Sequence, residues 1–254
     1  MLSFGQATDR GTIRTINQDA ICSVVAVSRS ADACLDFGLF IVADGVGGHH
    51  QGENASALAV NTVQAEILRQ LNLSGSAPAL FGLPILKILD QIVKMSNAAV
   101  LKSIPDSGTT LTAVLIIGDE AHIAHVGDTR AYLITQDSIE QLTEDHTLRH
   151  QLSKLGHIAP EDMRAEHLKS VLHRGLGMSD DLDVNTLIRR LPPGAQILVC
   201  SDGLWGNVSD DELREIVRNP SLSPQEACNK LVALANERGG SDNISVIVVQ
   251  MPPA

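Results

Sequence analysis

Short apolar runs rich in β-branched residues recur along this chain and alternate with longer amphipathic stretches. Runs of this length are typical of strands, whereas the amphipathic stretches carry apolar residues at helical spacing. We therefore predict strands at Phe37–Ala43, Thr110–Ile117, Ala121–Val126, Ala131–Ile134, Gln196–Cys200 and Ile244–Gln250. The amphipathic stretches predict helices at Asn54–Leu71, Pro84–Lys102, Asp145–Leu155, Asp210–Arg218 and Pro224–Arg238.

Two of the predicted helices have clear start signals. Ser209 with Glu212, and Ser223 with Glu226, each have the spacing of a capping box, and Pro224 suits the first helical position. The segment Asn72–Pro84 is rich in Ser, Gly, Ala and Pro, and we predict a loop between two helices there. The apolar pattern resumes at once after it, so we expect one domain across residues 1–254.

The three apolar runs between Thr110 and Ile134 are joined by tight connections. Such connections predict an antiparallel meander, because consecutive strands usually pair with each other. Helices mixed with antiparallel strands favour an α+β fold over a doubly wound parallel sheet.

The charge balance and the cysteines narrow the classes of partner and compartment. The formal net charge is -11, from 19 Lys+Arg against 30 Asp+Glu. Nucleic acids and anionic membranes bind basic faces, so we expect neither as a partner.

Cys22, Cys34, Cys200 and Cys228 lack the close spacing of a zinc knuckle or a redox dithiol, so we expect free thiols in a reducing cytoplasm.

Targeting signals are not evident in the sequence either. Residues Met1 to Arg10 have no basic region followed by an apolar stretch, so we expect no secretory signal. No apolar run approaches the roughly 18 residues of a membrane helix. We therefore expect a soluble, cytoplasmic protein.

Aspartates stand at the ends of the predicted strands. Asp44, Asp128 and Asp202 follow apolar runs, and Asp242 comes just before the last one. In an antiparallel sheet the end of one strand lies beside the start of its neighbour, so these carboxylates could converge at one edge. A turn-capping role would explain any one of them. Four together favour a metal site, because unpaired buried carboxylates are costly and oxygen ligands select magnesium, manganese or calcium over zinc.

The N-terminal segment adds an arginine and a fifth acid. The planar guanidinium of Arg14 could bind a phosphate through two parallel hydrogen bonds, although a surface salt bridge is the commoner role of a lone arginine. Asp19 is the fifth acid and follows five residues later. The glycine-rich stretch that begins at Asp44 lies between a strand and a helix, but it has neither of the nucleotide-binding glycine spacings. Glycine lets the backbone approach another group closely, so Gly45 could offer its carbonyl to a cation.

Histidines are weaker candidates for a metal site. His122 and His125 would lie on opposite faces of one strand. His146 and His150 would share a helical face, but without a neighbouring glutamate base or a third ligand we do not favour a zinc site.

Seven motifs occur in order between Thr8 and about Val249. They are Thr8-Asp9-x-Gly11-x-x-Arg14-x-x-Asn17-Gln18-Asp19, Val42-Ala43-Asp44-Gly45-Val46-Gly47-Gly48, Ser107-Gly108-Thr109-Thr110, Val126-Gly127-Asp128-Thr129-Arg130, Leu142-Thr143-x-Asp145-His146, Ser201-Asp202-Gly203-Leu204-Trp205 and Gly240-Ser241-Asp242-Asn243. Taken in this order, the motifs resemble the PPM family, the metal-dependent type 2C protein phosphatases, in its bacterial branch.

The resemblance implies a four-layer α-β-β-α sandwich with two central antiparallel sheets and metals at one end. Asp44 would bridge two Mn²⁺ or Mg²⁺ ions, with the Gly45 carbonyl on one of them. Asp202 and Asp242 would complete the first site, and Asp19 belongs with the second. A weaker third site would involve Asp128 together with Asp202, and Arg14 would bind phosphate.

The implied activity is hydrolysis of phosphoserine and phosphothreonine in proteins by a metal-activated water. The implied partners are phosphorylated proteins and a cognate serine/threonine kinase, and we expect a monomer. Val46 stands where eukaryotic members have a histidine that is a proposed general acid, so that role is unassigned here, with His49 and His50 nearby. Thr129 stands where serine is usual.

Two other functional classes fit the same resemblance. A pseudophosphatase that only docks a partner would be expected to have lost some of the acids, and all are present. A regulator that dephosphorylates a single partner protein would differ in substrate rather than in chemistry.

The segment from about Thr147 to Gly175 is predicted to govern substrate choice. It contains Lys154, Arg164 and Lys169 among few long apolar runs, and its position matches a flap beside the metal centre in bacterial relatives. Its basic side chains could meet acidic or phosphorylated peptide. The alternative is an ordinary helix and loop packed on the core.

Overall fold

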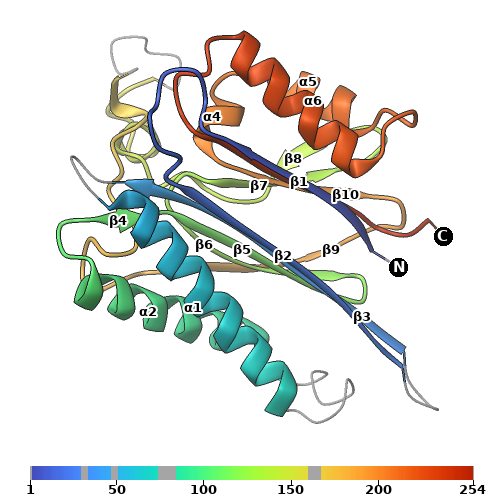
Figure 1. Ribbon diagram of the computed structural model, residues 1–254, viewed down its shortest axis with the longest axis horizontal. Coiled ribbons are helices and arrows are strands. Elements are labelled where there is room, and N and C mark those ends of the chain that lie inside the picture. Colours follow the sequence, from blue (N-terminus) through green and yellow to red (C-terminus); the bar gives the residue numbers. More distant parts are fainter. Residues whose placement is uncertain (1, 30–33, 47–50, 74–83, 160–166, 254) are drawn as a thin grey trace.

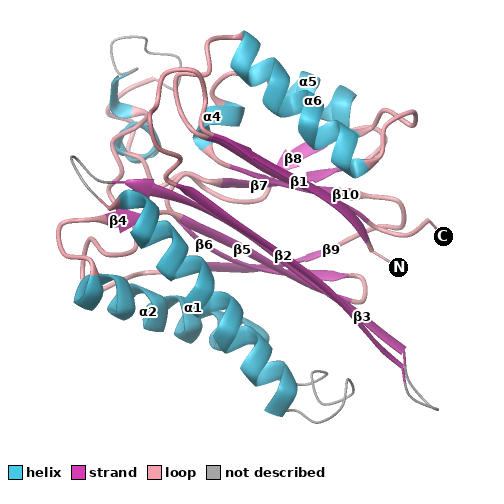
Figure 2. Ribbon diagram, in the orientation of Figure 1, coloured by secondary structure: helices cyan, strands magenta, loops and turns pink. Residues whose placement is uncertain are grey.

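A computed structural model of the chain describes residues 2–29, 34–46, 51–73, 84–159 and 167–253. Two antiparallel sheets lie face to face, and helices cover the outer face of each, which gives four layers (Figures 1 and 2). The predicted α+β sandwich with two central antiparallel sheets is confirmed.

The first sheet has the strand order β1-β11-β10-β7-β8. These strands are β1 (Ser3–Asp9), β11 (Ile244–Gln250), β10 (Gln196–Cys200), β7 (Arg130–Ile134) and β8 (Ile139–Gln141). The second sheet has the order β2-β3-β5-β6-β9, and the short β4 pairs with the end of β3. Its strands are β2 (Asp19–Arg29), β3 (Cys34–Val46), β5 (Leu111–Ile117), β6 (Glu120–Val126) and β9 (Asn185–Arg190), with β4 at Gly108–Thr109.

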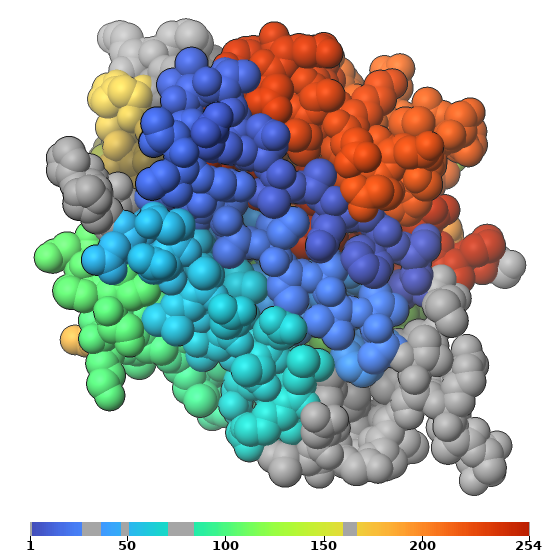
Figure 3. Space-filling model, in the orientation of Figure 1, coloured from blue at the N-terminus to red at the C-terminus, as the bar shows by residue number. Residues whose placement is uncertain are grey.

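The helices divide between the two outer faces. The helices α1 (Gly52–Leu73) and α2 (Ile85–Ser103) cover the second sheet, whereas α5 (Asp210–Val217) and α6 (Pro224–Glu237) cover the first (Figure 1). Two short helices, α3 (Leu148–Lys154) and α4 (Asp202–Trp205), lie toward one end of the sandwich. On the face drawn in Figure 3, the N-terminal segment separates α1 from the C-terminal helices.

Strand β3 shows why the sequences of the central strands are unbroken apolar runs. Leu39 and Ile41 pack against α1 and α2, and the alternate residues Phe40 and Val42 pack between the two sheets. All four side chains are fully buried. Successive side chains of a strand point to opposite faces, so a strand that is covered on both faces needs apolar residues at every position.

All six predicted strands and all five predicted helices are present, with shifted ends. Both capping boxes are confirmed, since the backbone N–H of Ser209 donates to Glu212 at 3.1 Å and that of Ser223 donates to Glu226 at 2.8 Å. The helix predicted from Asp145 is wrong at its start. Thr147 is the N-cap of α3, and its hydroxyl accepts the N–H of His150, so Asp145 precedes the helix.

The predicted three-stranded meander is also wrong. Strands β5 and β6 pair as a hairpin, but β7 joins the other sheet, between β10 and β8. The chain leaves the second sheet at Gly127, whose φ is 109°, and a Cβ there would lie 2.5 Å from Thr110. Glycine permits this left-handed turn and the close approach.

Some predictions concern residues outside those described. These are the greater part of the Asn72–Pro84 loop, the glycines and histidines at 47–50, and Arg164. Among the helices that are described, none is long and apolar enough to cross a membrane.

Candidate metal centre

Asp19 and Asp44 come together on neighbouring strands of the second sheet. Asp19 opens β2 and is the register partner of Asp44 near the end of β3. Burial raises the pKa of Asp19 to about 7, and the charges of Asp202 and Asp242 act in the same direction. Hydrogen bonds from Ser245 and Ser201 favour the charged carboxylate and partly oppose this increase. Both acids therefore lie where a negative charge is costly.

Asp202 and Asp242 approach the same point from the first sheet. Asp202 begins α4, just after β10, and Asp242 lies two residues before β11, which is the antiparallel neighbour of β10. Burial and the charge of Asp242 raise the pKa of Asp202 to about 6. Ser201 joins the two sheets, because its hydroxyl donates to Asp19 Oδ2 at 2.7 Å.

Asp128 is the fifth acid of the cluster and lies in the connection between β6 and β7, with 4% of its surface exposed. Burial and the charge of Asp202 raise its pKa well above the usual range. The pKa of Asp44 is likewise raised, by burial and then by Asp19, Asp202, Asp128 and Asp242. The charges of all four other carboxylates therefore act on Asp44.

The Gly-Thr-Thr segment fixes the backbone of Asp44. The Asp44 N–H donates to Thr110 Oγ1 at 2.9 Å, and the Asp44 carbonyl accepts both the Thr110 N–H at 2.8 Å and the Thr109 hydroxyl at 2.9 Å. The next residue, Gly45, donates its N–H to the Gln18 carbonyl at 3.0 Å. A Cβ on Gly45 would lie 2.2 Å from the Gly52 carbonyl oxygen, so a larger residue would force the backbone apart there.

Asn243 holds the N-terminal segment against Asp242. Its side-chain amide donates to the carbonyls of Arg10 at 2.9 Å and Ile16 at 3.0 Å, and its Oδ1 accepts the Gln18 N–H at 2.7 Å. Its own backbone N–H donates to Asp242 Oδ1 at 2.8 Å. Asn243, the residue next to Asp242, therefore positions the N-terminal segment that contains both Arg14 and Asp19.

Arg14 lies at the exposed rim of the acids. Its Nη2 is 2.7 Å from Asp242 Oδ2, and 49% of its side chain is exposed. The hydrogen bond to Asp242 is the main cause that raises its pKa, with smaller effects from Asp44 and Asp202. The salt bridge is thus present, and it places the guanidinium next to the acid cluster.

The cluster fits a divalent cation. The Oδ1 atoms of Asp19 and Asp202 are buried and have no hydrogen-bond partner, a costly state that a cation would relieve. Carboxylate donors suit magnesium and manganese. Within the described residues, no group of three or more His, Cys, Asp or Glu side chains is already spaced to hold a metal ion. Hydrated magnesium needs only one or two protein carboxylates and keeps several waters, so a closed cage is not required.

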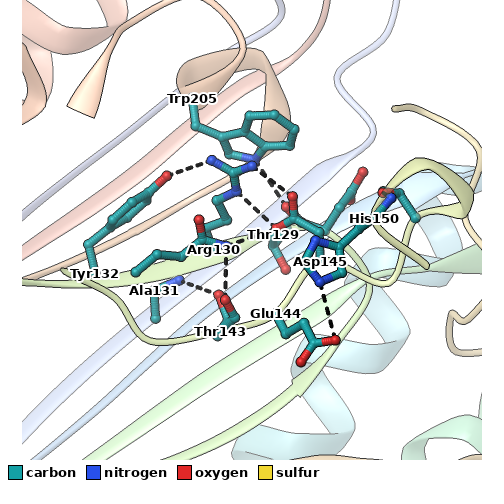
Figure 4. A network of polar contacts seen from close by, with 12 residues as sticks. Thr129, Arg130, Ala131, Tyr132, Thr143, Glu144, Asp145, His150 and Trp205 are labelled. Carbon is teal, nitrogen blue, oxygen red and sulfur yellow. Dashed lines mark hydrogen bonds and ion pairs between the residues drawn. The ribbon is translucent and has the colours of Figure 1, made fainter. Parts of the chain in front are cut away.

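A second network supports the backbone of Asp128 (Figure 4). The Arg130 guanidinium donates to Asp145 Oδ1 at 2.9 Å and Oδ2 at 2.7 Å, and it lies 3.6 Å from the centre of the Trp205 ring. The Trp205 indole N–H donates to the Asp128 carbonyl at 3.0 Å. On the other side, the Gly127 N–H donates to His146 Nδ1 at 3.0 Å.

His146 does not share a helical face with His150, because it precedes α3, so that prediction is wrong. Its ring lies 4.8 Å from that of His125 and 5.8 Å from that of His173. Burial lowers the pKa of His125 to about 4, and burial together with His125 lowers that of His146 to about 2. The rings of His125 and His146 are therefore neutral at ordinary pH and act through hydrogen bonds and packing.

The family model for protein phosphatase 2C matches residues 13–235. The chain belongs to the protein phosphatase 2C family. This confirms the resemblance to the metal-dependent type 2C phosphatases. The matched segment contains Arg14 and four of the five aspartates, all but Asp242.

Two bacterial phosphatases are similar to this chain over nearly all of its length. The chain is 32% identical to the serine/threonine protein phosphatase PstP of Mycobacterium tuberculosis over 99% of its length, and it spans 45% of that longer protein. It is 33% identical to the serine/threonine phosphatase stp of Listeria welshimeri, over 96% of this chain and 93% of that protein.

Solved structures of this family share the fold. A crystal structure of Mycobacterium tuberculosis PstP/Ppp matches with a TM-score of 0.80 and 30% identity, over 99% of each chain. The catalytic domain of PstP in complex with two manganese ions matches with a TM-score of 0.76 and 29% identity, over 98% of this chain and 97% of that one.

The supporting residues of this phosphatase-2C site were not assigned a role from the sequence. Ser201, Ser245 and Asn243 orient acids, and Thr109 with Thr110 holds the Asp44 backbone. Most stand beside or within the quoted motifs, next to the acids that they orient. Their position next to the acids is the one sequence feature that indicates a supporting role. Their hydrogen-bond partners cannot be predicted from it, because these depend on which strands pair.

Proposed function

We propose that this chain is a metal-dependent protein serine/threonine phosphatase that hydrolyses phosphoserine and phosphothreonine. The observation that carries this function is the gathering of five aspartates from both sheets at one end of the sandwich, with two buried carboxylate oxygens lacking partners. Family membership supports the same reaction, as does the pair of manganese ions in the PstP catalytic domain.

We assign the metal ligands by residue. Asp44, Asp202 and Asp242 with the Gly45 carbonyl would hold the two core ions together with Asp19, and Asp128 with Asp202 would hold a weaker third. Bound Mn²⁺ or Mg²⁺ supplies a water activated for attack on phosphorus and neutralises charge on the phosphoryl oxygens.

Arg14 would bind the substrate phosphate. Its guanidinium is fixed in charge, lies 2.7 Å from Asp242 and is half exposed, so it can turn a second N–H toward an incoming phosphoryl oxygen. Ser201 and Ser245 keep Asp19 oriented, and Thr109 with Thr110 fixes Asp44. These positions are set before substrate arrives, as electrostatic catalysis requires.

The remaining assignments complete the proposed role. We take residues 1–254 as one catalytic domain with a flap at about 147–175, acting as a monomer in the cytoplasm. Its substrates would be phosphorylated proteins, and a cognate serine/threonine kinase would produce them.

The test is hydrolysis of a small aryl phosphate and of a phosphoserine peptide. We expect manganese-dependent turnover of both that chelator abolishes and added manganese restores. Asp44→Asn should be inactive and correctly folded by circular dichroism. Undiminished turnover in excess chelator would exclude the metal-dependent reaction.

A further inference from the structure

A small hollow borders the network that supports Asp128. It has a volume of about 210 Å³ and is lined by Arg130, Asp145, Thr147, Arg149, His150, Ser153, Lys169 and Trp205. Trp205 links this lining to the metal centre, because its indole N–H donates to the backbone carbonyl of Asp128 at 3.0 Å. The hollow therefore borders the residues that hold the Asp128 backbone, and Figure 4 shows Asp145 and Trp205 of its lining gathered around the Arg130 guanidinium.

The charge of the lining is opposite to that of the molecule. Arg130, Arg149 and Lys169 supply three fixed cations against the single carboxylate of Asp145, whereas the whole chain has a net charge of -11. Arg130 is already engaged, since Asp145 accepts two of its N–H groups. Arg149 and Lys169 also interact within the chain, and what matters here is their charge and position. The fixed charges of the lining residues sum to a positive value, which favours an anion.

The remaining lining groups suit an oxygen anion. The hydroxyls of Ser153 and Thr147 are polar, and Trp205 forms a flat wall over which the Arg130 guanidinium is stacked. Lysine and arginine side chains with a hydroxyl are the usual partners of carboxylates and phosphates. A volume of about 210 Å³ accommodates one such group rather than a whole small molecule of drug size.

We propose that this hollow binds an acidic side chain of the substrate peptide, a few residues from the phosphorylated serine or threonine. The pocket then selects phosphoproteins whose phosphosite lies near Asp, Glu or a second phosphorylated residue. Since a substrate must occupy the neighbouring metal centre, the inference rests on the proposed function. Arg149 and Lys169 are the specificity-determining residues, since neither is among the residues assigned to the metals and the reacting phosphate.

The test measures kcat/KM for a set of phosphoserine peptides in which one glutamate is moved along an alanine background on either side of the phosphoserine. We expect one or two positions at which glutamate raises kcat/KM roughly fivefold to tenfold over alanine, the scale of one or two exposed charge pairs. Phosphoserine at the same position should raise it further. Inorganic phosphate should compete more strongly with the glutamate peptide than with the alanine peptide if the free ion also enters the hollow.

The double variant Arg149→Gln/Lys169→Gln should reduce this glutamate-to-alanine ratio to about one. The double variant Lys87→Gln/Lys230→Gln is the matched control, because it removes two exposed positive charges, from α2 and α6, outside the lining and should keep the ratio. Using a ratio within each variant corrects for any general loss of activity or folding.

The outcomes separate the two levels of inference. A wild-type enzyme that turns over the alanine peptide but gains nothing from glutamate at any position overturns the pocket and leaves the phosphatase function intact. A ratio that survives in the double variant does the same. Absence of phosphopeptide hydrolysis by the manganese-loaded wild type instead overturns the proposed function.

Discussion

Asp19 and Asp44 are direct register partners on β2 and β3, so two carboxylates face each other across one pair of strands. Like charges directly opposite in a sheet are destabilising, and Asp202, Asp128 and Asp242 add to the repulsion at Asp44. An arrangement of this kind lowers the stability of the metal-free fold. A bound cation would convert that repulsion into binding energy.

The first prediction concerns protons released when metal binds. Without metal, the raised pKa values of about 7 for Asp19 and about 6 for Asp202 keep these groups partly protonated below neutral pH. Metal ligands must be deprotonated, so manganese has to displace those protons. The affinity for manganese should therefore rise between about pH 5 and pH 7 and level off above pH 7.5.

Calorimetry in two buffers of different ionisation enthalpy would count the protons released. We expect release of at least about one proton per loaded protein at pH 6 and fewer at pH 8, since the raised pKa values of Asp44 and Asp128 add to those of Asp19 and Asp202. An affinity that stays constant from pH 5 to pH 7.5 would contradict the proposal that these acids are ligands.

The second prediction separates stability from activity at Asp44. Asp44→Asn removes the carboxylate that all four other acids repel, so in chelator at pH 8 it should raise the free energy of unfolding by about 1–2 kcal/mol. Turnover should fall by several orders of magnitude. Asp202→Asn and Asp242→Asn should lose activity similarly, whereas Asp128→Asn should keep more of it.

Urea unfolding in chelator and manganese-dependent aryl phosphatase assays would give the two quantities. Asp180→Asn, at an exposed position, serves as the control and should change neither. Activity of Asp44→Asn equal to wild type would refute its assignment as a ligand.

The third prediction concerns Arg14. Its guanidinium neutralises Asp242, so Arg14→Ala leaves the acid cluster more negative, and its affinity for manganese should stay the same or become slightly tighter. Loss of the phosphate contact should raise KM for a phosphopeptide about tenfold. Arg14→Lys keeps the charge but loses the planar fork, so its KM should be intermediate. Loss of metal from Arg14→Ala, measured by calorimetry, would show that the residue is structural instead.

The central strands were predictable from sequence, but the edge strands were not. β3, β5 and β10 are covered on both faces and are therefore continuous apolar runs. β1 and β9 lie at sheet edges, and most of their residues are only partly buried or exposed, so they lack such a run. The transfer of β7 to the other sheet depends on the turn at Gly127, which tight spacing alone could not distinguish from a hairpin.

For the candidate site, strand-end spacing indicated which acids would converge, but not how they are held. The convergence follows from antiparallel pairing, which the apolar runs imply. The hydrogen bonds of Ser201 to Asp19 and of Asn243 to Gln18 join residues 182 and 225 positions apart. Contacts of that range require the relative placement of the two sheets, which no local pattern specifies.

The last prediction concerns the pair of Arg130 and Asp145, whose side chains are 18% and 11% exposed. Burial alone would lower the pKa of Arg130, but its hydrogen bonds to Asp145 raise it, so the guanidinium stays charged.

Removing either partner leaves the other charge buried without its counter-ion, and we expect Arg130→Met or Asp145→Leu to cost about 3–5 kcal/mol of unfolding free energy. The double variant should cost clearly less than the sum of the two, because no unpaired charge remains and methionine can still cover the Trp205 ring. Urea unfolding in chelator gives these values without interference from metal binding. Costs that add fully would show that Arg130 and Asp145 act independently, and that the bidentate geometry contributes little to the support of the Asp128 backbone.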